Sequence, residues 1–366
     1  MIVKNETHVI ERCLASVKPL IDYWVIVDTG STDRTQEIIK EFMKDIPGEL
    51  HERPWVDFAH NRNEALNLAK GKADYLLFID ADDVFKIDAN FKMPPLDKDF
   101  YLINTLYSTV TYLRNQLVKS NLEWKWIGPV HEVLVCFPWS YNAATLEGVN
   151  MVIMGGGDRS RDPKKFLKDA KVLEAALKKE PDHARWVFYL AYSYRDAGML
   201  ERAIQTFEKR VSMGGWYEEV FWSLYQIACI QENLQMPEEV VTKSYQRAFN
   251  YLPTRAEPLY RLSNYYRRKE NYFLGYLMAK HGLEIKPPTQ ALLFIEYDTY
   301  NYQLLLEYSI CAYWIGRYEE SIKACVKLLS LELSPEVREC VQKNLNFALQ
   351  KVPMSSMTVA KNGLKN

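Results

Sequence analysis

This chain of 366 residues lacks the sequence features of several large protein classes. No stretch approaches the roughly 18 consecutive apolar residues that a membrane-spanning helix needs. The start carries no basic segment followed by an apolar stretch, so no secretion signal is indicated. Neither G-x-x-x-x-G-K-[ST] nor G-x-G-x-x-G occurs, so neither an NTPase nor a dinucleotide enzyme is indicated. These absences predict a cytoplasmic protein without a transmembrane segment.

The chain also has no excess of charge of one sign, and its cysteines do not occur in closely spaced pairs. The 46 Lys and Arg residues balance 47 Asp and Glu residues, which leaves a formal net charge of -1. Such a balance provides no overall field that would attract nucleic acid or an anionic membrane. The six cysteines show no C-x-x-C pair and no metal-ligand spacing. We therefore expect buried free thiols in a reducing compartment, and no nucleic-acid partner.

The first part of the chain, to about residue 155, alternates strand-like and helix-like segments. Residues 24–27 and 75–79 are short continuous apolar runs, as buried strands have. The apolar residues within 35–43 and within 59–68 have the spacing of helices, and both segments lie between the two strand-like runs. This alternation predicts an α/β domain with a largely parallel sheet, in which ligands bind at the carboxyl ends of the strands.

From about residue 162 onward the apolar period is helical, and an internal repeat is visible. Large and small residues alternate at equal offsets in three copies, as antiparallel helix pairs need for close packing. These positions are Leu190, Ala191, Tyr194, Ala203 and Phe207; Leu262, Ser263, Tyr266, Gly275 and Ala279; and Tyr308, Ser309, Ala312, Ser321 and Cys325. Gly198 and Gly316 fall where a turn between paired helices belongs, and Pro253 and Pro287 follow second helices. The set resembles the tetratricopeptide repeat, so we expect an all-α solenoid.

A glycine triplet at residues 155–157 marks the junction between these two parts. The sequence thus predicts an α/β domain over residues 1–157 and a helical repeat domain over residues 158–352. Residues 353–366 are polar and lack periodicity, so we expect a disordered tail.

The chemistry of the first domain centres on an acidic cluster, D-A-D-D at residues 80–83, at the end of the apolar run 75–79. Neighbouring carboxylates raise each other's pKa, so a cluster of them is costly. A divalent cation such as Mg²⁺ or Mn²⁺ would offset that cost, because hard oxygen ligands suit it. The alternative is a helix N-cap or a solvated turn.

Three further segments accompany this cluster and would meet it at one edge of a parallel sheet. They are M-I-V-K-N-E at residues 1–6, V-D-T-G-S-T-D-R-T at 27–35 and F-A-H-N-R-N-E-A-L at 58–66. Together with F-I-D-A-D-D at 78–83, their types, order and spacing resemble the inverting family-2 glycosyltransferases of the GT-A fold. The whole chain is similar to bacterial proteins that fuse such a domain, with its Rossmann-like mixed sheet, to tetratricopeptide repeats.

The resemblance implies donor-site roles for particular residues. Asp28 would accept a hydrogen bond from a nucleobase or a ribose hydroxyl, and the Arg62 guanidinium would contact the nucleotide. Asp80 would face ribose or sugar hydroxyls and take part in catalysis. The full set that the resemblance assigns to the nucleotide or donor is Asn5, Glu6, Asp28, Arg62, Asp80, Ala81 and Trp126.

The resemblance also implies a metal and a base. Asp82 would coordinate Mn²⁺ or Mg²⁺, which neutralises charge on the diphosphate leaving group. His131 is the candidate second metal ligand, and Glu132 is the candidate base that deprotonates the acceptor. The alternative is that His131 is a structural residue and Glu132 an ion-paired one. Asp83 would support the cluster indirectly.

Two departures from the family pattern bear on this site. The chain begins directly on the first strand, so we expect a short strand or an N-terminal truncation. Related repeat-bearing proteins tend to have a His near the junction glycines, where this chain reads M-V-I-M-G at residues 151–155. The lack of that His weakens the prediction of a complete metal site.

The sequence leads to one main hypothesis and one alternative. The main hypothesis is a metal-dependent inverting glycosyltransferase that uses a nucleotide-diphosphate sugar, with UDP as the favoured nucleotide. Its acceptor would be a peptide or protein held by the repeats. The alternative is a repeat scaffold whose GT-A domain is catalytically weak or inactive. The donor sugar, the acceptor and the oligomeric state stay open at this point.

Overall fold

The structure is a computed structural model that describes residues 1–352. The predicted disordered tail, residues 353–366, lies outside the described residues. The described chain forms two compact units: Met1–Gly215 with Leu292–Phe294, and Trp216–Ala291 with residues 295–352. The predicted boundary between residues 157 and 158 falls where strands give way to helices within the first unit, and as a domain boundary it stays a prediction.

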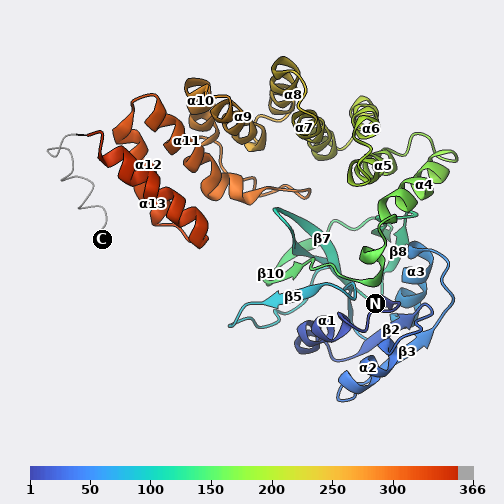
Figure 1. Ribbon diagram of the computed structural model, residues 1–366. Helices are drawn as coiled ribbons and strands as arrows, with labels where there is room; N and C mark the ends of the chain where they lie inside the picture. Colours follow the sequence, from blue (N-terminus) through green and yellow to red (C-terminus); the bar gives the residue numbers. More distant parts are fainter. Residues whose placement is uncertain (353–366) are drawn as a thin grey trace. The chain divides into compact units, whose positions relative to one another are not determined.

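The first unit begins with a parallel three-stranded sheet in the order β1-β2-β3 (Figure 1). Its elements are β1 (Ile2–Val3), α1 (Ile10–Val17), η1 (Lys18–Leu20), β2 (Trp24–Asp28), α2 (Thr35–Phe42), β3 (Gly48–Glu52) and α3 (Phe58–Ala69). The predicted helices at residues 35–43 and 59–68 and the predicted strand at residues 24–27 match these bounds closely.

A second, five-stranded sheet follows in the order β4-β7-β6-β10-β5, together with the hairpin β8–β9. The strands are β4 (Tyr75–Leu77), β5 (Val84–Ile87), β6 (Phe100–Tyr107), β7 (Val110–Lys119), β8 (Glu123–Ile127), β9 (Val133–Phe137) and β10 (Ala143–Val152). In this sheet only β6 and β10 pair in parallel. The expectation of a largely parallel sheet therefore holds only for β1–β3. The tight turn between β6 and β7 can join antiparallel strands only.

Helix α1 packs against both sheets and fixes their spacing. Ile10 and Leu14 pack in a core with Ile26 of β2 and Ile39 of α2. Cys13 and Val17, on the other side of the helix, belong to the core of the five-stranded sheet. This two-sided packing orders the loops that follow β1 and β4.

The rest of the first unit is helical. It comprises η2 (Asp158–Arg161), α4 (Lys165–Leu177), α5 (Ala184–Asp196) and α6 (Leu200–Ser212). The second unit contains α7 (Tyr217–Asn233), α8 (Glu238–Tyr251), α9 (Glu257–Arg268), α10 (Tyr272–Gly282), the π-helix η3 (Thr299–Gln303), α11 (Leu304–Trp314), α12 (Tyr318–Leu329) and α13 (Pro335–Leu349). Figure 1 shows α7 to α13 as successive packed helices.

The predicted repeat is confirmed, because its small positions lie where paired helices touch. Ala203, Ser263 and Ser321 are fully buried. A Cβ atom added at Gly275 of α10 would lie 2.8 Å from the Cys311 sulfur and 3.1 Å from the Ser263 carbonyl oxygen. No larger residue fits there without a shift of the backbone. Gly198 has a φ of 76° in the turn between α5 and α6, as a helix-ending glycine requires.

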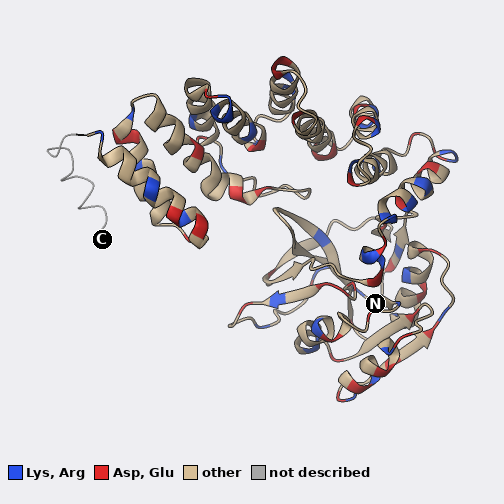
Figure 2. Ribbon diagram, in the orientation of Figure 1, with Lys and Arg blue, Asp and Glu red and all other residues tan. Residues whose placement is uncertain are grey.

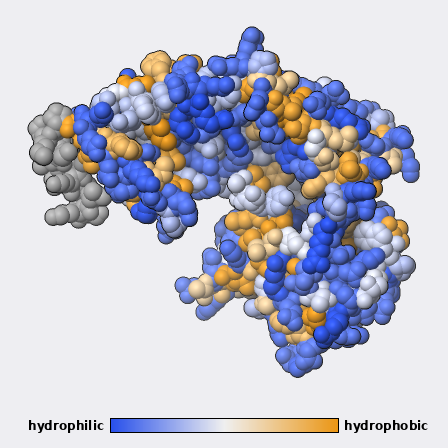
Figure 3. Space-filling view, in the orientation of Figure 1, coloured by the Kyte–Doolittle hydropathy of each residue, from blue (hydrophilic) through white to orange (hydrophobic). Residues whose placement is uncertain are grey.

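All six cysteines are free, as predicted, but only four are buried: Cys229 is half-buried and Cys340 is exposed. None of the helices within residues 1–352 is long and apolar enough to cross a membrane. On the face drawn in Figure 3, apolar residues gather over parts of both units, among mostly hydrophilic surface.

Candidate active site

Arg62 is the centre of the candidate site. Its Nη2 donates to Asp80 Oδ1 at 2.6 Å, and its Nε donates to Glu132 Oε1 in a very short hydrogen bond. The guanidinium carbon lies 5.1 Å from the centre of the Trp126 ring. One cation thus joins the end of β4, the loop after β8 and an aromatic face.

The electrostatics of this group follow from the ion pairs. Burial alone would raise the pKa of Asp80, but the neighbouring Arg62 and Arg114 hold it below its usual value. Burial likewise opposes the charge on Arg62, yet Asp80 and Glu132 raise its pKa. Arg62 and Asp80 are therefore both charged at neutral pH.

Asn63, which the sequence analysis did not single out, holds the hairpin in place. Its Nδ2 donates to the Trp126 carbonyl at 2.9 Å, and its Oδ1 accepts from the Trp126 amide at 2.8 Å. The apolar side chains Leu66, Trp124 and Leu134 pack beneath this contact. The signal that would have found Asn63 is the amide directly after Arg62 in the N-R-N triplet.

Asp28 is oriented by the turn that follows β2. Its Oδ1 accepts from the amides of Gly30 at 2.8 Å and Ser31 at 2.7 Å. The residue is only 1% exposed, and Oδ2 is buried without a hydrogen-bond partner within residues 1–352. An acceptor atom left in this state is costly unless a ligand satisfies it.

Asn5 and Glu6 fasten the end of β1 to the same turn. Asn5 has a φ of 56°, and its Oδ1 accepts from the Thr32 amide at 2.8 Å. The Glu6 amide donates to the Thr35 hydroxyl at 2.8 Å. The Asn5 side chain therefore orders the loop. Ala81, another predicted donor contact, is buried in the core with Ile10.

The glycine triplet of the junction lies against the acidic cluster. The Gly157 amide donates to Asp82 Oδ2 at 3.2 Å, and the Asp158 amide donates to Glu6 Oε2 at 3.3 Å. Arg12 of α1 donates to the carbonyl oxygens of Asp82 at 2.9 Å and Gly155 at 2.5 Å. A Cβ atom at Gly157 would lie 2.9 Å from Asp82 Oδ2, so a larger residue would displace the Asp82 carboxylate.

Two carboxyl groups in this region hold protons unusually well. Burial, reinforced by Asp80 and Asp82, raises the pKa of Asp83 to about 8. Burial also raises the pKa of Glu6 to about 7, with Asp82 and Asp158 adding repulsion. The acidic cluster therefore carries less negative charge at neutral pH than its composition indicates.

His131 lies in a different environment from Asp82. Its ring stacks on Tyr189 of α5 with centroids 4.1 Å apart, and its carbonyl accepts from Arg185 at 3.3 Å. Desolvation and nearby cations, Arg159 and Arg185 foremost, lower the pKa of His131. The residue is nevertheless exposed, so its imidazole is accessible to solvent.

A divalent metal fits this site only in part. Residues 1–352 contain no group of three or more His, Cys, Asp or Glu side chains arranged to hold a metal ion. Asp82 and His131 are therefore not joined in a complete protein-made site. Mg²⁺ is commonly held by one or two carboxylates together with substrate phosphates, and Asp82 meets that smaller requirement.

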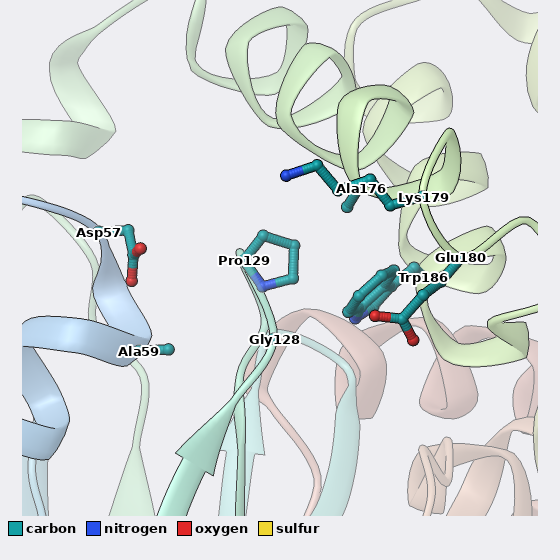
Figure 4. Close-up of a pocket in the computed structure, with 8 residues that line it drawn as sticks. All are labelled: Asp57, Ala59, Gly128, Pro129, Ala176, Lys179, Glu180 and Trp186. Carbon is teal, nitrogen blue, oxygen red and sulfur yellow. The ribbon is translucent and has the colours of Figure 1, made fainter.

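A shallow pocket of about 300 Å³ opens beside the Arg62 group. Figure 4 shows Pro129 between the start of α3, with Asp57 and Ala59, and the helical side, with Lys179 and Trp186. Ala59 lies one helical turn before Arg62, and Pro129 is in the same loop as Glu132. Glu132 itself is not among the residues that line the pocket.

The predicted site residues therefore fall into separate contact groups. Arg62, Asp80, Trp126 and Glu132 form one contact group. The Gly157 amide and the neighbouring Asp158 amide tie Asp82 to Glu6. Two other members of the predicted set, Asn5 and Asp28, bind the turn after β2.

Comparisons with known proteins agree with this geometry. Residues 1–93 match the family model described as Glycosyl transferase family 2. The SPbeta prophage-derived glycosyltransferase SunS of Bacillus subtilis (strain 168) is 26% identical over 230 residues, 58% of this chain and 52% of that protein. The chain thus spans about half the length of this relative.

Two shorter matches and a solved structure complete the comparison. A TPR repeat-containing protein of Synechococcus elongatus is 40% identical over 90 residues, 24% of this chain and 21% of that protein. A poly-beta-1,6-N-acetyl-D-glucosamine synthase of Staphylococcus epidermidis is 36% identical over 97 residues, 24% of this chain and 22% of that protein. A crystal structure of MamA protein covers 49% of this chain and 93% of its own, with 18% identity and a TM-score of 0.37. The predicted resemblance of the N-terminal segment to family-2 glycosyltransferases is confirmed by the family match.

Proposed function

We propose that this protein is a glycosyltransferase that moves a sugar from a nucleotide-diphosphate donor, with UDP as the favoured nucleotide, to an acceptor. The observation that carries the proposal is the Arg62 group, in which one buried guanidinium binds Asp80 and Glu132 beside Trp126. The family match over residues 1–93 includes Arg62 and the acidic cluster. The glycosyltransferase names of SunS and of the glucosamine polymer synthase support the same reaction class.

The donor would lie across the ends of β1, β2 and β4. Asp28 Oδ2 would accept a hydrogen bond from the nucleobase or ribose, which would satisfy its buried lone pairs. Arg62, which lies over the buried Trp126 ring, would hold the nucleotide from the α3 side. Asp80 would face sugar or ribose hydroxyls. Asn5 and Glu6 would act through the loop that they order.

A metal ion would complete the charge balance on the donor side. Asp82 would hold Mn²⁺ or Mg²⁺, which would supply neutralisation of the diphosphate leaving group. His131 is not proposed as a second ligand. Positive side chains, Arg159 and Arg185 foremost, act on its ring and would raise the electrostatic cost of a dication beside it.

Glu132 is the proposed base. In an inverting transfer, the acceptor hydroxyl attacks the anomeric carbon as the bond to the diphosphate breaks on the opposite face. The hydroxyl proton passes to a carboxylate in the same step. Glu132 Oε1 is held by Arg62, while Oε2 accepts no hydrogen bond from any residue in the described part of the chain. Oε2 is therefore the proton-accepting atom.

The acceptor would reach Glu132 through the pocket at Pro129 and Trp186. An aromatic face and flanking polar groups suit a peptide segment, and helical repeats commonly present such segments. We therefore propose a peptide or protein acceptor.

A second candidate function is a repeat scaffold with a catalytically weak GT-A domain. The observation that favours it is the engagement of Glu132 by Arg62, because an ion-paired carboxylate is a poor base unless substrate binding releases it. The absence of a three-ligand metal group within residues 1–352 points the same way.

Release of nucleotide diphosphate separates the two functions. The protein is incubated with a panel of sugar nucleotides, with Mn²⁺ and with EDTA, and free nucleotide diphosphate is measured. The enzyme proposal expects release from at least one donor, and Glu132→Gln should lower that rate by at least about 100-fold. Donor binding without release from any sugar nucleotide would support the scaffold instead.

Asp82→Ala tests the metal role separately. The variant should lose Mn²⁺-dependent nucleotide binding while its melting temperature stays unchanged, because Asp82 contributes little to the core. Equal Mn²⁺-dependent affinity in the variant and the parent would contradict the role of Asp82.

A further inference from the structure

The loop between β8 and β9, residues 128–132, binds two different helices through two adjacent residues. The ring of His131 stacks on Tyr189 of α5, with centroids 4.1 Å apart and planes inclined by 9°. The next residue, Glu132, accepts a hydrogen bond from Arg62 of α3. We call this segment the β8–β9 loop. The loop that carries the proposed base is therefore held by α3 and by α5.

The backbone of the β8–β9 loop adopts an unusual conformation at both ends. His131 has a φ of 53°, in the left-handed region that residues other than glycine seldom adopt. Gly128 has a φ of 112°, where glycine is favoured. A left-handed residue with a side chain costs free energy, so it persists only where neighbouring contacts hold it, and such residues gather at active sites. The conformation of His131 therefore requires support from outside the loop.

Helix α5 supplies this support through two residues on one face. Arg185 Nη2 donates to the His131 carbonyl at 3.3 Å and to the Tyr189 hydroxyl at 3.4 Å. The guanidinium carbon also lies 4.8 Å from the centre of the Tyr189 ring. Arg185 and Tyr189 are neighbours on the helix surface, because they are about one helical turn apart. This face of α5 thus fixes both the ring and the carbonyl group of His131.

A third residue of α5 reaches the other end of the β8–β9 loop. A Cβ atom added at Gly128 would lie 3.4 Å from Glu132 Cα and 3.6 Å from Trp186 Nε1. Figure 4 shows Trp186 beside Gly128 and Pro129. The Trp186 ring is itself held by a stack on His183, with centroids 3.9 Å apart. The indole therefore limits how far the loop that carries Glu132 can shift.

These contacts depend on aromatic faces and hydrogen bonds, with no ion pair between α5 and the loop among them. Figure 2 shows charged residues of both signs along the neighbouring helix α4, which packs on α5. Toward the β8–β9 loop, α5 presents the half-buried rings of Trp186 and Tyr189. An aromatic side chain has only two rotatable torsions, so a stacked ring fixes orientation as well as distance. Such a contact is suited to hold a loop in one conformation.

We propose that Tyr189 and Arg185 are positioning residues for the proposed base Glu132 and act on it through His131. They hold His131 in its left-handed conformation, and this conformation keeps the Glu132 carboxylate at Arg62. Their contribution is geometric, because a displacement of about 1 Å at a catalytic group can lower a rate about 100-fold. The inference rests on the proposed glycosyltransferase function for the role of Glu132.

The test uses Tyr189→Leu, which removes the stacking face, and Tyr192→Leu as the matched control. Tyr192 lies on the same helix but packs on Phe188 and Phe207. In Tyr189→Leu, the kcat of nucleotide-diphosphate release should fall at least about tenfold, while the KM for the donor changes less than about twofold. Tyr189→Phe keeps the ring, so its kcat should fall no more than about threefold.

The control decides whether the effect is specific to the loop. Tyr192→Leu should keep the kcat of the parent. An equal fall of kcat in Tyr189→Leu and Tyr192→Leu would mean that α5 acts only through overall stability, and this result overturns the proposal. An unchanged kcat in Tyr189→Leu, in a parent that releases nucleotide diphosphate, keeps the glycosyltransferase function and rejects the positioning role.

A double-mutant cycle tests the route through His131. In a chain that already carries His131→Ala, the stacking partner of Tyr189 is absent, so Tyr189→Leu should lower kcat by less than about twofold more. Effects of the two substitutions that simply multiply would contradict action through the His131 ring.

Hydrogen exchange gives a result that does not depend on activity. Peptides that span the β8–β9 loop should lose protection in Tyr189→Leu and keep it in Tyr192→Leu. A parent that releases no nucleotide diphosphate from any sugar nucleotide rejects the proposed function, and exchange then decides the inference by itself. Protection lost only in Tyr189→Leu keeps α5 as the element that positions Glu132, and equal protection in both variants overturns it.

Discussion

Replacement of Arg62 by methionine is the most direct test of the candidate site as a structural unit. Methionine keeps the length and apolar stem of the side chain but removes the charge. It leaves Asp80 and Glu132 facing each other without the cation that binds both. The Arg62 side chain is 12% exposed, Glu132 is 8% exposed and Asp80 is 31% exposed.

The expected cost follows from these exposures. Loss of one partner from a buried ion pair destabilises a protein by about 3–5 kcal/mol, because the remaining charge is left uncompensated. Because water reaches Asp80, its unpaired charge contributes little to the loss of stability. The unpaired charge of the more buried Glu132 accounts for most of that loss. We therefore expect about 3 kcal/mol, and Glu132→Gln in the same chain should recover about 2 kcal/mol of it.

Hydrogen exchange read peptide by peptide is the suitable assay. A chain with two compact units need not unfold in one step, so a single denaturation midpoint would mix their stabilities. Peptides from α3 and from the β8–β9 hairpin should lose protection. Arg34→Met, which removes an exposed ion pair with Glu37, should cost no more than about 0.5 kcal/mol. Equal protection in Arg62→Met and Arg34→Met, or no recovery with Glu132→Gln, would refute the reasoning.

Two further predictions concern the acidic cluster. Asp83 has a folded-state pKa of about 8 against an ordinary value of 3.8, so its unfolded form ionises first and stability falls as pH rises from about 4 to 8. Asp83→Asn should therefore match the parent near pH 4 and exceed it by on the order of 5 kcal/mol at pH 8. Hydrogen exchange of peptides from the five-stranded sheet measures this difference, and a difference that stays constant across that pH range would contradict the assignment. Gly157→Ala places a Cβ atom 2.9 Å from Asp82 Oδ2 and 3.2 Å from Glu6 Oε2. Mn²⁺-dependent nucleotide affinity should fall about tenfold while metal-free affinity stays constant, and equal losses in both would show a general distortion instead.

Sequence periodicity predicted most of the fold, because it reports local structure. The apolar run at residues 24–27 became β2, and the helical spacing at residues 35–43 and 59–68 became α2 and α3. The small residues of the repeat, such as Ser263 and Gly275, lie buried where the helices touch. Periodicity did not reveal that β4 leaves the parallel sheet, since strand direction depends on pairing with β7 far along the chain.

The sequence by itself predicted which residues form the candidate site: the acidic cluster, Arg62 and Asp28, with the glycine junction at the end of the domain. Tertiary structure alone decided how they act on one another. Arg62 meets Glu132 across 70 positions of the chain, and Gly157 meets Asp82 across 75. The role of Asn63 became visible only when α3 packed against the β8–β9 hairpin. Such contacts depend on the summed geometry of all intervening turns and cores, which no local pattern contains.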